Sequence, residues 1–197
     1  MVYTIAPAVR RSPGLRSWAL VSATYALGSV LGGAITGFAV GLTGSALSIF
    51  HLSSQLTRVA FGLLAGASVI RDVRFPMSTL PALHRQVPER WRGSLPLPIA
   101  TFLYGFQLGL GWATHAYFAT YYVLLGFVLM TGNAASGAFL VALYGFGRAS
   151  VVLMFPPESE DLDHRLERMG ARRTLVGQVG ALATLLLAAG ALTARVR

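Results

Sequence analysis

The sequence contains no cysteine and no lysine, and only seven of its 197 residues are acidic. Without cysteine the chain forms no disulfide and carries out no thiol–disulfide exchange. Charged residues make up 12% of the chain, whereas a soluble domain carries about 25%. With 54% hydrophobic residues, the composition predicts an integral membrane protein, folded as one transmembrane domain over residues 1–197.

A helix that spans a bilayer needs about 20 apolar residues. The chain has five stretches of this kind, which predict an all-α transmembrane bundle. They cover residues 18–42, 53–70, 98–130, 134–155 and 174–194.

All sixteen basic residues are arginines, and they cluster between the apolar stretches. Basic residues favour the cytoplasmic side of a membrane. We therefore expect the loops 71–97 and 156–173 and the N-terminus to be cytoplasmic, with the C-terminus external, in a multi-pass protein of the inner (plasma) membrane. The formal charge of +9 is explained by this orientation, so we expect no nucleic acid partner.

The third stretch contains the string Gly-Leu-Gly-Trp-Ala-Thr-His at residues 109–115. This string resembles the fourth transmembrane segment of the CcdA family, of the cytochrome c biogenesis type, which includes the membrane domain of DsbD. That family typically has Gly-Trp-Thr-Pro-Cys here, so His115 stands where the redox cysteine would be and Thr114 where proline would be. The resemblance implies a five-helix bundle similar to spans two to six of the CcdA fold, a cysteine-less form lacking the first span.

The third stretch is also too long for one straight spanning helix, because residues 98–130 would extend about 50 Å across a core of about 30 Å. Gly105, Gly109 and Gly111 predict a break near residues 105–115. An ionisable side chain inside a membrane is a functional candidate. His115 is therefore a candidate ligand for a metal ion, a haem or a solute, with help from Gln107 and Thr114, or else it forms a hydrogen bond to a neighbouring helix.

Arg148 lies inside the fourth stretch, with no acidic residue nearby in sequence. Its side chain either reaches the cytoplasmic headgroups or faces the interior. In the second case it needs a carboxylate, a phosphate or a haem propionate, so Arg148 is a further candidate ligand-binding residue. The sequence itself specifies no cofactor, although a haem or a metal ion fits these residues.

Two glycine ladders predict close contacts between helices. Gly33, Gly37 and Gly41 repeat at intervals of four in the first stretch, and Gly62 and Gly66 do so in the second. Such ladders either pack inside the bundle or dock a partner. Beyond the lipid bilayer, we expect other membrane-protein subunits or a homo-oligomer as partners.

No nucleophile triad, paired-carboxylate site, P-loop or dinucleotide fingerprint is present, so we expect no enzymatic activity. We predict a non-catalytic accessory subunit or assembly factor of a larger membrane complex. One alternative is a transporter for a small solute, a metal or haem, with its site at His115. A second is a thiol-reductant relay that uses the cysteines of a partner.

Overall fold

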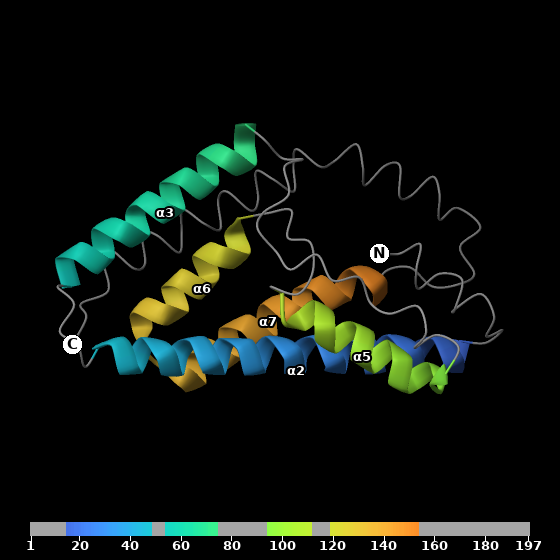
Figure 1. Ribbon diagram of the computed structural model, residues 1–197. Helices are drawn as coiled ribbons and strands as arrows, with labels where there is room; N and C mark the ends of the chain where they lie inside the picture. The colour runs from blue at the N-terminus through green and yellow to red at the C-terminus, as the bar shows by residue number, and fades with distance from the viewer. Residues whose placement is uncertain (1–14, 49–53, 75–93, 112–118, 154–197) are drawn as a thin grey trace.

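The computed structural model describes residues 15–48, 54–74, 94–111 and 119–153. These residues form five α-helices and no strand, so the predicted all-α fold is confirmed (Figure 1). The helices are α2 (Leu15–Ser48), α3 (Ser54–Arg74), α5 (Leu97–Gly109), α6 (Thr120–Thr131) and α7 (Ala134–Leu153).

Helix α2 is the central helix, and α5, α6 and α7 pack against it (Figure 1). Gly28 of α2 lies against Phe102 and Phe106 of α5, and Gly32 lies against Phe106 and Leu110, so α5 runs parallel to α2. Helix α7 runs antiparallel to α2. Along α2, the successive glycines Gly33, Gly37 and Gly41 contact Val141, Gly137 and Ala134 of α7. Two helices of opposite direction therefore flank the same central helix.

The glycines of α2 form two separate flat faces. Gly28 and Gly32 face the backbone of α5, whereas Gly33 and Gly37 face the backbone of α7. At 100° per residue, the two pairs point about 140° apart around the helix. A Cβ atom at any of these positions would overlap a backbone carbonyl of the neighbouring helix. Small residues therefore set the distance between the helices on both sides of α2.

Ser29 occupies the boundary between the two glycine faces and is fully buried. Its hydroxyl donates a hydrogen bond to the carbonyl oxygen of Gly145 on α7, at 2.9 Å. The backbone of Ser29 also lies against Gly109 of α5 and Gly145 of α7, where a side chain would clash. Three helices therefore meet at one serine, and each of them contributes a residue small enough to allow the contact.

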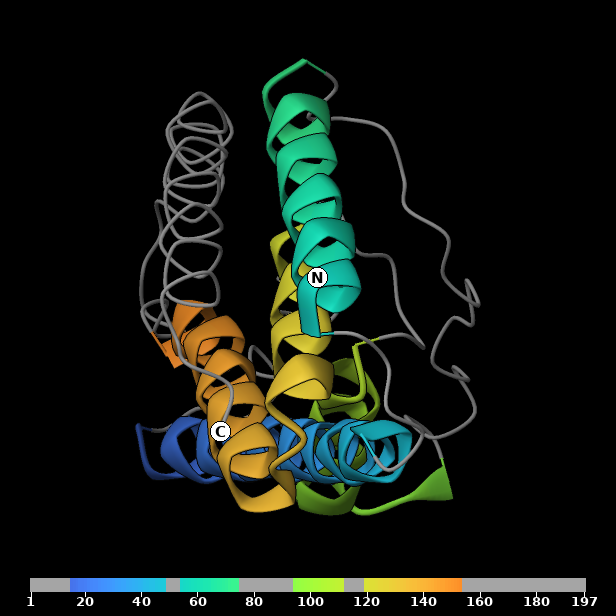
Figure 2. The same ribbon diagram turned by 90° about the vertical axis from the view of Figure 1, so that its left-hand side faces the viewer.

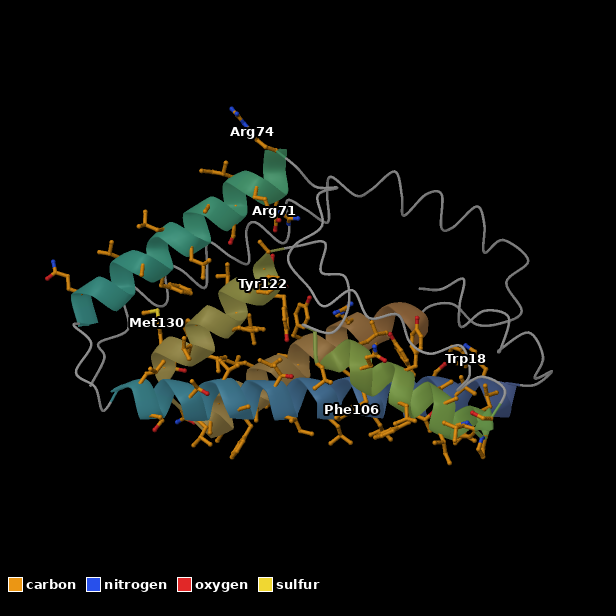
Figure 3. All side chains as sticks on the ribbon, viewed as in Figure 1. Trp18, Arg71, Arg74, Phe106, Tyr122 and Met130 are labelled. Carbon is orange, nitrogen blue, oxygen red and sulfur yellow. The ribbon has the colours of Figure 1, made fainter. Side chains whose placement is uncertain are left out.

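The opposite side of α2 carries a continuous row of large apolar side chains that are about half exposed. They are Leu20, Leu27, Leu31, Ile35, Phe38 and Leu42. Figure 3 shows side chains standing along the edge of α2 that faces away from α3 and α6. The buried side of the helix, by contrast, includes the small polar residues Ser22, Ser29 and Thr36 at intervals of seven. From Gly28 onward, helix α2 thus presents small residues to the protein and large apolar side chains to the outside, whereas Val21 and Tyr25 are buried nearer its start.

Helices α3 and α6 pair with each other on one side of this arrangement, with α6 between α3 and α2 (Figures 1 and 2). Phe61 and Ala65 of α3 are buried against Val123 of α6. Phe127 and Met130 of α6 complete this cluster, and the rings of Phe61 and Phe127 are 6.4 Å apart.

The predicted spans and the observed helices differ most clearly at the end of α2 and within the third span. Helix α2 continues to Ser48, six residues past the expected end, because Gly44 in its last turns packs against Leu129 of α6. The third predicted span consists of two helices, α5 and α6, so the expected break is present. The predicted span 174–194 lies outside the described residues.

A five-span membrane bundle is more than the described residues establish. Among them, a single segment, residues 18–47 of α2, is both long enough and apolar enough to cross a membrane. Helices α5 and α6 have 13 and 12 residues, which at 1.5 Å per residue gives each a length of about 20 Å, less than the hydrocarbon core.

Replacing Gly37 with alanine should destabilise the protein, because the added Cβ atom would overlap the Gly137 carbonyl group and lie 2.9 Å from the Cβ atom of Val141. Overpacking of this kind costs about 1–3 kcal/mol. Thermal unfolding of purified protein in detergent micelles measures the effect.

Gly62→Ala is the matched control for Gly37→Ala, because a Cβ atom there meets no described atom within 4 Å. Alanine is the better helix former by about 1 kcal/mol, so this variant should be as stable as wild type or more stable. Equal stability of Gly37→Ala and Gly62→Ala would show that the α2–α7 contact is looser than described.

Candidate functional site

The candidate site is built around the end of α5. Helix α5 begins after Pro96, and Leu110 closes its last turn with a hydrogen bond from its N–H to the Phe106 carbonyl. The next residue, Gly111, has a φ of 69°, a left-handed conformation that favours glycine. A side chain at Gly111 would also overlap the ring of Tyr121. Glycine is therefore needed here twice, for the turn and for the approach of Tyr121.

Side chains from three other helices reach the carbonyl oxygens of Leu108 and Leu110 at the end of α5. The Leu108 carbonyl also accepts the backbone N–H of Gly111, at 3.1 Å. The hydroxyl of Tyr121 donates to the Leu110 carbonyl at 2.9 Å. Thr36 of α2 makes a longer contact of 3.5 Å to the same oxygen. The Nη1 atom of Arg148 donates to the Leu108 carbonyl at 3.4 Å. A cation near a helix C-terminus is favoured by the helix dipole, so Arg148 stabilises this end.

Three tyrosines lie in the part of the bundle that contains Arg148. Tyr144 lies one turn before Arg148 on α7, and its ring centroid is 5.1 Å from that of Tyr121. Tyr25 of α2 packs in one cluster with Leu108 and Ala149, the immediate neighbour of Arg148. The charge of Arg148 interacts electrostatically with the phenol groups of all three tyrosines. A single positive charge therefore sits among three phenols contributed by α2, α6 and α7.

Asp72 holds the start of α6. This carboxylate is buried near the C-terminal end of α3, and both of its oxygens accept the backbone N–H of Ala119, at 3.1 and 2.9 Å. Arg71 forms an ion pair with the same carboxylate at 2.7 Å. Figure 3 labels Arg71 on the side of α3 toward α6, while Arg74 points away. A carboxylate at a helix N-terminus satisfies free N–H groups and complements the helix dipole.

The structure places two of the four predicted ligand-binding residues. Gln107 lies on α5 and is partly exposed. Arg148 lies on α7, and its guanidinium group reaches the C-terminal end of α5. Thr114 and His115 lie outside the described residues. Within the described ranges there is no group of three histidines or acidic residues that could bind a metal ion.

The predicted glycine residues fall into two classes. Gly33, Gly37 and Gly41 pack directly on the backbone of α7. Gly62 and Gly66 of α3 meet no described atom within 4 Å. The first ladder is therefore an internal contact, whereas the second lies on a face of α3 that no described helix covers.

Sequence reasoning overlooked Asp72 and Tyr121. Asp72 is the single acidic residue before Glu89, and it follows an apolar stretch directly. An isolated acid at the end of an apolar helix is a signal for a buried partner that the sequence did offer. Tyr121 gave no comparable signal, because its role depends on the turn at Gly111.

Comparisons with known proteins identify relatives that all carry the same name. The chain is 30% identical over 148 residues to the methylamine utilization protein MauF of Paracoccus versutus, an alignment that covers 72% of this chain and 52% of that protein. The MauF proteins of Methylophilus methylotrophus and Paracoccus denitrificans are 28% and 31% identical over 143 and 134 residues. These alignments cover 72% and 68% of this chain and 50% and 47% of the relatives.

The chain thus spans about half the length of the curated relatives it matches. No family model and no solved structure matches it. The predicted membership of the CcdA family, with its role in cytochrome c biogenesis, is wrong, because the relatives are named MauF. The residues behind it, a tryptophan in a glycine-rich apolar string, are common in any transmembrane segment.

Replacing Asp72 with alanine should destabilise the protein by about 2–3 kcal/mol, because it leaves the buried Ala119 N–H without its acceptor and removes the ion pair with Arg71. Asp72→Asn keeps one acceptor oxygen and should cost less. Hydrogen exchange should become faster in the first turn of α6 in both variants, and thermal unfolding measures the loss of stability.

Arg74→Ala is the control for the Asp72 variants, since Arg74 is exposed on the same end of α3 and such a change costs at most about 0.5 kcal/mol. If Asp72→Ala unfolds at the temperature of Arg74→Ala, the cap on α6 contributes nothing to stability.

Proposed function

We propose that the chain is a multi-pass inner-membrane protein that serves methylamine utilization as a non-catalytic accessory or assembly factor. The observation that carries this proposal is the similarity to MauF proteins of several bacteria, over about 70% of the chain. Those relatives are named for methylamine utilization.

The arrangement of side chains around α2 supports a membrane location. Soluble proteins rarely expose a long stripe of large apolar side chains. Helix α2 buries Ser22, Ser29 and Thr36 but leaves Leu27, Leu31 and their neighbours outside. From Leu20 to Leu42 the outer stripe is about 33 Å long, close to the thickness of a hydrocarbon core.

The distribution of arginines supports the orientation. Arg10 and Arg11 precede α2, Arg16 lies in its first turn, and no further charged residue follows until Arg58. With the N-terminus in the cytoplasm, Trp18 lies near the cytoplasmic end of α2, where tryptophan favours the interface. Further spans, including residues 174–194, complete the proposed bundle, with the C-terminus external.

The uncovered face of α3 is where we place a protein partner. Gly62 and Gly66 form a small-xxx-small pair without a described neighbour, and Val59, Leu63 and Ile70 on the same face are more than half exposed. Such faces allow a second helix to approach closely inside a membrane. A transmembrane helix of another subunit, or of a second copy, fits this surface.

Deletion of the gene should abolish growth on methylamine while leaving growth on other substrates unchanged, and the wild-type gene should restore it. Gly62→Leu should fail to restore growth, because a large side chain on the α3 face blocks the partner. Growth rates of the complemented strains measure the effect, and immunoblots of membranes show that each variant is present.

Gly147→Leu is the matched control for the growth experiment. Gly147 of α7 also meets no described atom within 4 Å, but no second glycine pairs with it at an interval of four. This variant should restore growth fully. Normal methylamine growth of the deletion strain would refute the proposed role, and equal behaviour of the two leucine variants would refute the assignment of the partner face.

A further inference from the structure

Arg148 is partly buried, and its guanidinium group makes one hydrogen bond to the described residues. A guanidinium group has five N–H donors in a planar fork. Among the described residues only the Leu108 carbonyl accepts one of them, and at 3.4 Å this hydrogen bond is long. Leu108 itself is buried, so the guanidinium group turns into the bundle rather than toward the headgroups.

Arg148 has no counter-ion among the described residues. Asp72 is the one acidic residue in that part of the chain. Its two oxygens are already engaged by Arg71 and by the N–H of Ala119. A charge in a low-dielectric interior needs a partner of opposite charge or a full set of hydrogen bonds. The Leu108 carbonyl supplies one acceptor, so most of the fork still lacks one.

Two tyrosine hydroxyls are also available beside this charge. Tyr25 and Tyr144 flank Arg148 from α2 and α7, and their hydroxyls make no hydrogen bond within the described part of the chain. The hydroxyl of Tyr121 is different, because the Leu110 carbonyl accepts it. A guanidinium fork and two phenol hydroxyls therefore present donors, and no competing carboxylate, in one place.

We propose that Arg148, Tyr25 and Tyr144 form a binding site for an oxyanion, either a carboxylate or a phosphate, carried by a ligand that enters the bundle beside the end of α5. The planar fork of arginine matches two oxygens of such a group. The oxyanion belongs either to an anionic phospholipid headgroup or to a small soluble ligand. This site is independent of the proposed accessory role, because it uses α2, α5 and α7 and not the face of α3.

The unfolding temperature of the purified full chain tests the site. The protein is measured in neutral maltoside micelles, which carry no phosphate, with inorganic phosphate, with acetate or with added phosphatidylglycerol, against chloride at equal ionic strength. A ligand at about 100 times its dissociation constant should raise the unfolding temperature by about 5 °C or more. A response to phosphatidylglycerol alone identifies a lipid, and a response to phosphate or acetate identifies a soluble ligand.

Arg148→Gln should remove the rise in unfolding temperature, while Arg74→Gln, which removes an exposed arginine, should retain it. If Arg148→Gln does not fold, the double variant Tyr25→Phe/Tyr144→Phe tests the site instead, because it keeps the arginine and its hydrogen bond to Leu108. The double variant should need about ten times more ligand for half of the effect. An unfolding temperature that no probe raises, or an equal response in the variants and wild type, would overturn the site.

Discussion

The close approach of α5 and α7 to the backbone of α2 is the contact on which the rest of the structure depends. It exists because residues without large side chains, from Gly28 to Gly41, cover the protein-facing half of α2. Ser29 adds the one side-chain hydrogen bond that joins α2 to α7 at the centre of this contact. In a membrane, where apolar surfaces gain nothing by leaving lipid, such packing and hydrogen bonding drive helix association.

The same contact determines where the candidate site lies. Because α5 runs parallel to α2 and ends beside Gly32, the carbonyl group of Leu108 in its last turn is placed opposite Arg148 of α7. Tyr121 can then hold the Leu110 carbonyl from α6, while Asp72 fixes the start of that helix from α3. The interruption between α5 and α6 is thereby anchored at both of its ends, and the positive charge of Arg148 is brought next to three tyrosines.

The sequence predicted the helical class, the position of α2 and a break near residues 105–115, because length, apolar runs and glycine spacing report directly on these features. It grouped the glycines of α2 into a single flat side, since Gly33, Gly37 and Gly41 repeat at four. The second face, Gly28 and Gly32, depends on where α5 lies, which no local pattern encodes. The isolated acid Asp72 signalled a buried partner, but no local pattern identifies that partner as Ala119, which lies 47 positions away.

The central claim is that the large apolar stripe of α2 faces lipid while its small residues face protein. Because the chain lacks cysteine, single cysteines at Leu27, Leu31 and Phe38 can carry spin labels in a bilayer without background. Collision rates with oxygen and with a water-soluble nickel complex measure their surroundings. Lipid exposure predicts frequent collisions with oxygen and rare collisions with nickel at all three positions, and frequent collisions with nickel would contradict the claim.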